Sequence, residues 1–417
     1  MPELTSPTLS ALTSPDRPPR SFLATLILFA MLGPFAMTSF VPALPAIGET
    51  FDIHSGAAQL VLTLSLIGTA FASLAYGKVS DWIGWHHAVL LGLAIACAGS
   101  IIAAAGSSIQ MVIIGRLIQA IGAGSSFVLI RLIVYDAYGP SRSTAMLGYV
   151  TAAMALSPMF APLIGGLIID NYHWRWIFGT VAIGSLIILC LTIRFFPAAT
   201  ETRSANQVNE FPGTSWLSLL RHPDFLRFST VSVSAVATFY AFLSGAPHLL
   251  IGTTGVGLTA TEYGVYYSLV PLGFLSGSFF AGRWGAQLGN NRLCLLGCSL
   301  NLFGAVLAFS LVTVFGISPL AIVGPITIGA IGVGLANTGS QAGLVASSPE
   351  RPGVASGLCA FGQLMISAVV VQLTGVLVGI GAIVVTLTMV VTAASGLIGY
   401  AWWSRESRPG PTSPAPT

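Results

Sequence analysis

The chain has 417 residues, of which 54% are hydrophobic and only 7% are charged, and its mean hydropathy is +0.86. Soluble domains usually carry about 25% charged residues, so this composition excludes an ordinary water-soluble fold. The net charge of +3 is too small to indicate a nucleic-acid partner. The composition therefore predicts an integral membrane protein with several spans.

The first stretch, 1–20, is rich in Pro, Ser and Thr, and we expect a disordered cytoplasmic tail rather than a cleaved signal peptide. After it come apolar segments that each approach the roughly 20 residues a membrane-spanning helix needs. We predict twelve of them: 22–46, 57–77, 87–106, 110–133, 144–168, 176–196, 228–250, 263–285, 292–313, 318–343, 354–378 and 381–403.

The longest polar stretch between these segments divides them six and six. The sequence therefore predicts an all-α integral membrane fold with two pseudo-symmetric six-helix bundles. We expect a bundle at 21–197, a cytoplasmic linker at 198–227, a second bundle at 228–403 and a disordered cytoplasmic tail at 404–417.

The positions of the basic residues test this count. With the N-terminus in the cytoplasm, every Lys and Arg falls on the inner side except Arg175, which lies outside, and Arg116, which lies within a span. Loops on the cytoplasmic side carry an excess of Lys and Arg, so twelve spans with both termini cytoplasmic is the predicted topology. The expected location is the bacterial inner membrane.

The inner loop after the second segment reads "GKVSDWIGWHH" (77–87), and its glycine spacing returns in "GRWGAQLGNNR" (282–292) of the second half. Gly77, Asp81 and Gly84 are the candidate functional residues of this loop. Asp81 could pair with Arg131 or Arg142, or face a helix N-terminus. The plainer interpretation is a solvated turn with one acid.

The fourth segment contains "QMVIIGRLIQAIGAG" (110–124), in which a cation interrupts an apolar helix. Arg116 and Gln119 share a helix face with small residues that would let a neighbouring helix approach closely. An intramembrane charge normally faces a cavity or a partner, so both residues are predicted to line a central cavity. Alternatively, Arg116 snorkels to the outer surface.

The fifth segment contains "GYVTAAMALSPMFAPLIGG" (148–166). Pro158 and Pro162 each lack a backbone donor and lie on one face because they are four residues apart. Gly165 and Gly166 would permit close packing against a neighbouring helix. We predict that these four residues belong to the gating machinery.

No carboxylate falls in the middle of a predicted span, so no buried acid is available to balance Arg116. If side chains of this protein exchange protons, the first candidates to titrate are Asp81 and Asp136 at inner helix ends. Phe35 and Thr38 of the first segment and Tyr240 of the seventh are further candidate cavity residues.

These motifs, in this order, resemble the major facilitator superfamily. The loop 77–87 resembles the superfamily's signature between helices 2 and 3, and Arg116 with Gln119 resembles its helix 4 signature. The fifth segment resembles the helix 5 signature of antiporters. Further stretches resemble Bcr/CflA-type multidrug exporters: "FVPALP" (40–45), "RLIVYDAYG" (131–139), and "SPMFAPLIGG" followed by "WRWIF".

The resemblance implies a secondary transporter that exports drug-like molecules, with Gly77, Asp81 and Gly84 as gating residues of a loop that latches the cytoplasmic side. It departs from the Bcr/CflA pattern at Thr38, where an acid is usual. The alternative is a facilitator or importer of a small metabolite without proton coupling. We expect no enzyme activity, cofactor or metal, because no metal-ligand spacing and no phosphate-binding loop is present. The expected partners are a small-molecule substrate, the bilayer and protons, with the protein a monomer.

Overall fold

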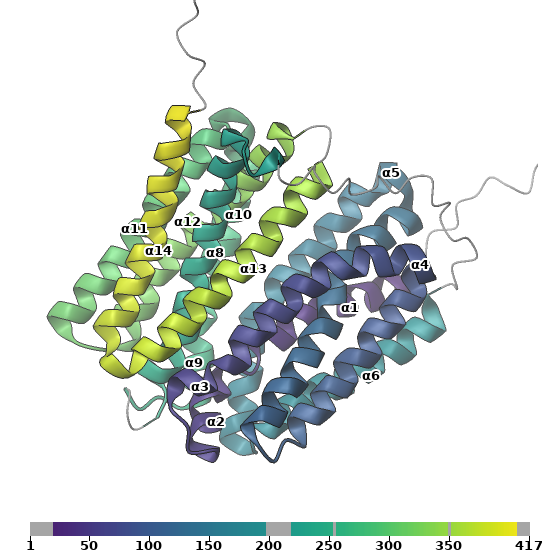
Figure 1. Ribbon diagram of the computed structural model, residues 1–417, viewed down its shortest axis with the longest axis horizontal. Helices are drawn as coiled ribbons and strands as arrows, with labels where there is room; N and C mark the ends of the chain where they lie inside the picture. The colour runs from purple at the N-terminus through teal and green to yellow at the C-terminus, as the bar shows by residue number, and fades with distance from the viewer. Residues whose placement is uncertain (1–19, 197–217, 253–255, 349–351, 407–417) are drawn as a thin grey trace, which may run out of the picture.

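The computed structural model describes residues 20–196, 218–252, 256–348 and 352–406 (Figure 1). Within these ranges every named element is a helix, as predicted. The first half contains α1 (Arg20–Thr38), η1 (Val41–Ala43), α2 (Leu44–Thr50), α3 (Ser55–Ala58), α4 (Leu60–Ala104), α5 (Ile109–Asn171) and α6 (Arg175–Phe195). The second contains α8 (Pro223–Leu250), α9 (Ala260–Tyr267), α10 (Leu269–Leu288), α11 (Asn290–Phe315), α12 (Pro319–Ser347), α13 (Pro352–Leu377), η3 (Val378–Ile380) and α14 (Ala382–Glu406).

Eleven described segments are long and apolar enough to cross a membrane, and one of them, Ser55–Ala104, has 50 residues. As one straight helix it would be about 75 Å long, more than twice the roughly 30 Å of a bilayer core. Gly84, with φ of 78°, interrupts it, so it provides two spans. The fold therefore fits the twelve spans predicted.

Glycines of the repeated loop motif lie where the chain turns between spans. Gly84 and Gly289 are the second glycines of the two similar loops, and both have positive φ, of 78° and 76°. Residues with a Cβ rarely adopt this conformation, so the two halves turn their chains in the same way at equivalent places. Gly139, with φ of 68°, breaks the 63-residue α5 in the same manner.

The two halves of the chain lie on opposite sides of the molecule, in purple to blue and in teal to yellow (Figure 1). Small residues set the helix spacing inside each half. A Cβ on Gly122 of α5 would strike the backbone at Ala96 of α4, and one on Gly297 of α11 would strike the backbone at Ala336 of α12. The close approach expected for the small-residue face of the fourth span is therefore observed.

Some helices extend beyond the predicted bundle limits. α8 begins at Pro223, inside the stretch predicted as linker, and α14 continues to Glu406. Pro at the first helical position and Asp224 in the first turn both favour a helix start at this point. Most of the linker and of the tails lies outside the described residues, so the domain limits stay a prediction.

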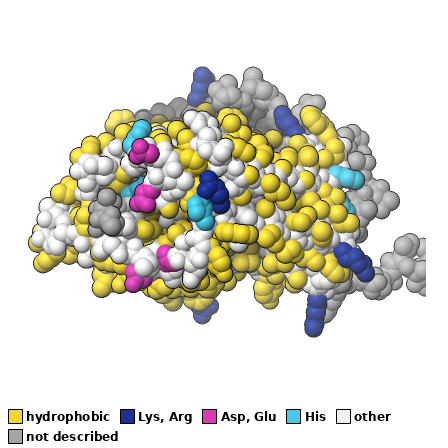
Figure 2. All heavy atoms as spheres, turned by 90° about the horizontal axis from the view of Figure 1, so that it is seen from below, with side chains coloured by type: hydrophobic (Ala, Val, Ile, Leu, Met, Phe, Trp, Pro, Cys, Tyr) yellow, Lys and Arg dark blue, Asp and Glu magenta, His cyan; other side chains and the backbone are white. Residues whose placement is uncertain are grey.

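The outer surface is apolar over most of its area. Phe279, Leu320 and Ile398 are 70%, 66% and 65% exposed. The face drawn in Figure 2, which is seen from below in the view of Figure 1, is also largely hydrophobic, but acidic, basic and His side chains gather on one part of it. Soluble monomers rarely expose such continuous apolar area. This surface fits contact with lipid chains.

Candidate transport cavity

A cavity of about 1630 Å³ lies between the two halves. Eight helices contribute to its wall, three from the first half of the chain and five from the second. We call it the central cavity, and its lining includes residues of α1 (Pro34, Met37, Thr38), α4 (Ser73, Gly77, Lys78, Asp81), α5 (Phe127, Arg131, Thr151, Met154, Pro158), α8 (Thr238, Phe239, Tyr240), α10 (Phe274), α11 (Asn301), α12 (Asn337, Gln341) and α13 (Gly353, Ser356, Gly357, Gln363).

The central cavity reaches solvent at one end of the bundle. Its charged lining residues are Lys78, Asp81 and Arg131, and all three are exposed. We call this the open end. Gly77 and Pro158 also line the cavity, so four predicted gating residues, these two with Asp81 and Arg131, contribute to its wall.

At the opposite end, which we call the closed end, the two halves meet backbone to backbone. A Cβ on Gly165 of α5 would collide with the carbonyl oxygen of Ser39, and one on Gly166 would collide with that of Ala260 in the other half. A Cβ on Gly264 of α9 would reach the backbone at Pro162 and Leu163. Of the helix 5 residues predicted to pack closely, Gly166 therefore joins the halves here, whereas Gly165 packs against Ser39 of its own half.

A carboxylate strengthens the closed end. Asp170, at the end of α5, accepts hydrogen bonds from the backbone N–H groups of Ala260, at 3.1 Å, and Thr261, at 2.8 Å. These are the first residues of α9, where N–H groups lack helical partners and a negative charge is favoured. Asp170 of one half thus caps a helix of the other.

Side chains of α13 form a second set of contacts at the closed end. Gln372 donates to the carbonyl oxygen of Gly56 at 3.0 Å and accepts from the hydroxyl of Thr63 at 2.9 Å. Ser55 donates to the carbonyl oxygen of Gly375 at 3.0 Å. Polar contacts between the halves at this end therefore come from α3, α4, α5, α9 and α13.

Arg116 does not line the central cavity, contrary to the expectation from sequence. The side chain is 2% exposed and Gln119 is fully buried. The guanidinium donates to the carbonyl oxygen of Ala36, at 3.1 Å, and to Oε1 of Gln119. Its Cζ atom lies 3.9 Å from the centre of the Phe40 ring. Snorkelling to the surface is not observed either.

These contacts show what balances the charge in place of an acid. Ala36 lies in the last turn of α1, where carbonyl groups have no helical N–H partner and the helix dipole is negative. The aromatic face of Phe40 adds a cation–π contact. Gln119 donates in turn to the hydroxyl of Ser100 at 2.7 Å. Arg116 therefore caps α1 beside the closed end, because at this height its helix face meets α1 instead of the cavity.

The remaining predicted residues divide between the cavity and the packing around it. Thr38 and Tyr240 line the cavity, whereas Phe35 is not among its lining residues. The hydroxyl of Thr38 donates to the carbonyl oxygen of Pro34 at 2.9 Å, and that of Tyr240 lies 3.3 Å from Sδ of Met37.

The two acids predicted at the open end, Asp81 and Asp136, differ in their contacts. Asp136 accepts a hydrogen bond from the indole N–H of Trp85 at 2.9 Å, so a neutral donor of the loop 77–87 contacts this acid. Among the described side chains the one ion pair is Arg227 with Asp224, at 2.9 Å, so no described salt bridge joins Asp81 to Arg131. The side chain of Arg142 lies outside the described residues.

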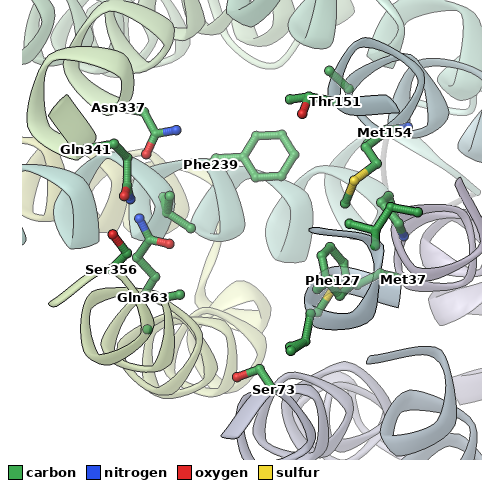
Figure 3. Close-up of a pocket in the computed structure, with 18 of the residues that line it drawn as sticks. Met37, Ser73, Phe127, Thr151, Met154, Phe239, Asn337, Gln341, Ser356 and Gln363 are labelled. Carbon is green, nitrogen blue, oxygen red and sulfur yellow. The ribbon is translucent and has the colours of Figure 1, made fainter. Parts of the chain in front are cut away.

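Sequence reasoning missed a cluster of uncharged polar side chains in the second half. Asn337, Gln341 and Gln363 line the cavity and gather on one side of it in Figure 3. They meet at the hydroxyl of Ser232, which is fully buried in α8. The signal was present, since amides are costly in apolar spans and need a partner or a cavity.

Two helical halves around one cavity that is open at one end and closed at the other define a membrane transporter with alternating access. The sequence model of the Major Facilitator Superfamily matches residues 26–371. The chain belongs to this superfamily, as the motifs predicted.

Individual relatives agree with this assignment. The chain is 26% identical over 405 residues to the uncharacterized MFS-type transporter YdgK of Bacillus subtilis, covering 95% of this chain and 98% of that protein. It is 23% identical over 304 residues to a bicyclomycin resistance protein homolog of Haemophilus influenzae, covering 72% and 76%. The fold is similar to the partially occluded inward-open structure of the xylose transporter XylE from E. coli, with a TM-score of 0.71, 12% identity and coverage of 93% and 98%.

Proposed function

We propose that the protein is a secondary active transporter that exports drug-like, amphipathic small molecules in exchange for protons. The observation that carries this proposal is the central cavity, which is large and mainly apolar, lies between the two halves and is open at one end only. Clefts of this kind bury most of a drug-sized ligand. The similarity to a bicyclomycin resistance protein homolog supports drug molecules as the substrates.

The open end is proposed to face the cytoplasm of a bacterium. Lys78, Arg131, Arg283 and Arg292 lie at helix ends on that side, whereas Arg175 lies beyond the closed end. Both termini are then cytoplasmic, and the protein works as a monomer in the inner membrane. Reporter proteins fused after residues 205 and 410 should behave as cytoplasmic, and one inserted near Asn171 as periplasmic.

Alternating access then requires the closed end to separate while the open end closes. The contacts of Gly166 and Asp170 with the second half must break in each cycle, and the glycines at the open end must come into contact. Rocking of two rigid halves about a central site produces both changes.

A drug-susceptibility panel tests the proposal. Cells that lack their main exporters should become more resistant to bicyclomycin and to other antibiotics when they express this protein, and a proton uncoupler should abolish the gain. Everted membrane vesicles should accumulate the same compounds against a gradient when acidified inside. Unchanged resistance to the whole panel at verified expression would refute export.

The second candidate is a facilitator or importer without proton coupling. It is favoured by one observation: Asp81 is the single carboxylate lining the cavity among the described residues, and it is exposed at the open end. This candidate predicts flux that follows the substrate gradient in proteoliposomes and ignores an imposed pH gradient. Proton exchange predicts the opposite, with Asp81 or Asp136 as the first carriers to test by substitution with Asn.

A further inference from the structure

We propose that Ser232, Asn337, Gln341 and Gln363 form the polar subsite of the central cavity, and that the protein selects uncharged amphipathic molecules over lipophilic cations. This inference rests on the proposed export function and names the substrate class of the same cavity. We call these four residues the amide subsite.

The amide subsite is organised around one buried hydroxyl. Ser232 donates to Oδ1 of Asn337 at 3.1 Å. It accepts from Nε2 of Gln363 at 2.6 Å and from Nε2 of Gln341 at 3.4 Å. Three amides from α12 and α13 are therefore held together by a single side chain of α8, with their positions fixed before any substrate arrives.

Ser232 bonds to only one of the two polar groups of each side-chain amide. A side-chain amide has two N–H donors and a carbonyl acceptor, and Ser232 engages one end of each. Within the described part of the chain no hydrogen bond engages the NH₂ group of Asn337 or the carbonyl oxygens of Gln341 and Gln363, so these groups remain for a molecule in the cavity. The subsite therefore offers donors and acceptors together, which suits hydroxyl, amide or carbonyl groups and carries no net charge.

The wall contributed by the first half has the opposite character. Met37, Phe127 and Met154 lie across the cavity from the amides (Figure 3). Phe239 of α8 lies between the two groups. Thioether and aromatic side chains adapt to varied apolar shapes. A substrate with a polar group at one end and an apolar body at the other would satisfy both walls at once.

The distribution of charged residues in the cavity wall favours uncharged substrates over cations. The charged lining residues Lys78, Asp81 and Arg131 are all exposed at the open end, and the deeper polar ones, such as Thr238 and Asn301, are neutral. A cation moved into the interior loses its hydration and finds no carboxylate there. Aromatic rings return only part of that cost through cation–π contact. An uncharged molecule avoids the cost altogether.

The direct test compares two probes in proteoliposomes: chloramphenicol, which is uncharged and carries hydroxyl and amide groups, and tetraphenylphosphonium, a permanent cation. We expect uptake of chloramphenicol to exceed that of tetraphenylphosphonium at least tenfold. Gln341→Leu combined with Gln363→Leu should weaken chloramphenicol binding about tenfold, since two neutral hydrogen bonds are lost. Thr313→Val, at an exposed position outside the cavity, is the control and should change nothing.

A gain-of-function variant keeps the test independent of folding losses. Gln341→Glu places a carboxylate beside the cavity and should raise tetraphenylphosphonium uptake several-fold while lowering that of chloramphenicol. Equal uptake of both probes by the parent, or full chloramphenicol binding in the double Leu variant, would overturn the amide subsite and leave export intact. If neither probe nor any compound of the antibiotic panel is transported, the proposed function itself fails.

Discussion

Glycines at the two ends of the central cavity have opposite surroundings. At the closed end, Gly165 and Gly166 leave no space for a Cβ, because backbone atoms of Ser39 and Ala260 occupy it. At the open end, Gly77, Gly353 and Gly357 line the cavity, and a Cβ on each would meet nothing within 4 Å. One set of glycines is packed in this conformation and the other set is free.

The difference teaches that glycines alone do not tell which end is shut. In a transporter that rocks, the open-end glycines are the natural candidates for close packing when that end closes. What distinguishes the closed end here is polar contact added to close packing, above all the cap of Asp170 on α9. Four substitutions can break or sharpen this comparison, given from the largest expected effect to the smallest.

Substitution of Gly165 by Ala should have the largest effect. The added Cβ meets the backbone of Ser39, which cannot move aside as a flexible side chain could. We expect transport to fall below roughly a tenth of the parent value, since overpacking of this kind costs about 1–3 kcal/mol. Transport in proteoliposomes at equal expression is the measurement.

The matched control is Gly184→Ala in α6, where a Cβ meets nothing within 4 Å. It should leave transport unchanged and stabilise the helix slightly. Parent-like transport in Gly165→Ala would mean that the closed end does not depend on this contact.

Replacement of Arg116 by Lys should reduce transport about tenfold, nearly as much as replacement by Ala. Lys has no planar fork with which to bind the carbonyl oxygen of Ala36 and the amide of Gln119 together. Hydrogen bonds from a charged group contribute about 1.5–3 kcal/mol each, and α1 would lose its cap beside the closed end. Thermal stability of the purified protein should fall as well.

Arg194→Lys provides the comparison, because Arg194 is exposed in the last turn of α6. It should retain parent transport and stability. If Arg116→Lys behaved in the same way, the capping role assigned to the guanidinium would have to be abandoned.

Asp170→Ala should loosen the closed end by a smaller factor. Loss of a capping side chain costs about 1 kcal/mol, which corresponds to a roughly fivefold change in the population of the separated state. A cysteine placed at Thr38, in a background without other cysteines, can report the population of the separated state when a thiol reagent is added on the side of the closed end. Its labelling by a membrane-impermeant thiol reagent should become about fivefold faster.

Glu49→Ala removes another exposed acid in α2 near the same end and should leave the labelling rate unchanged. Equal acceleration by both substitutions would point to general electrostatics in place of the cap.

Gly357→Ala should have the smallest effect. Nothing within 4 Å opposes the new Cβ in this conformation, so thermal stability should stay within about 0.5 kcal/mol of the parent. If α13 packs closely when the open end shuts, transport should still slow about twofold. A twofold slowing without any stability change is therefore the expected pattern, and a large stability loss would contradict it.

Much of the fold could be predicted because the bilayer restricts it strongly. Spans of about 20 apolar residues predicted the all-helical fold and its two halves, and the positions of Lys and Arg predicted the direction of the helices. The glycine pairs 77/84 and 282/289 marked equivalent turns, and the second glycine of each pair does take positive φ. These features are local, so a single sequence contains them.

The site was predicted less well, because the sequence of a helix face does not show which other helix packs against that face. Arg116 was expected in the cavity, but its partners on α1 and α6 are far away in sequence. Asp170 was one carboxylate among several at helix ends until the structure placed it against α9. The amides at 337, 341 and 363 drew no attention because they converge only through Ser232 of another helix.

The sequence by itself determined a twelve-span helical membrane transporter of the major facilitator superfamily, since hydrophobic length, basic-residue placement and short motifs are properties of contiguous residues. Only the tertiary structure decided which end is closed, what balances Arg116 and where the polar wall of the cavity lies. Each of these depends on helices from distant parts of the chain meeting at one height in the membrane. That meeting is set by close packing between helix faces, which local sequence patterns do not encode.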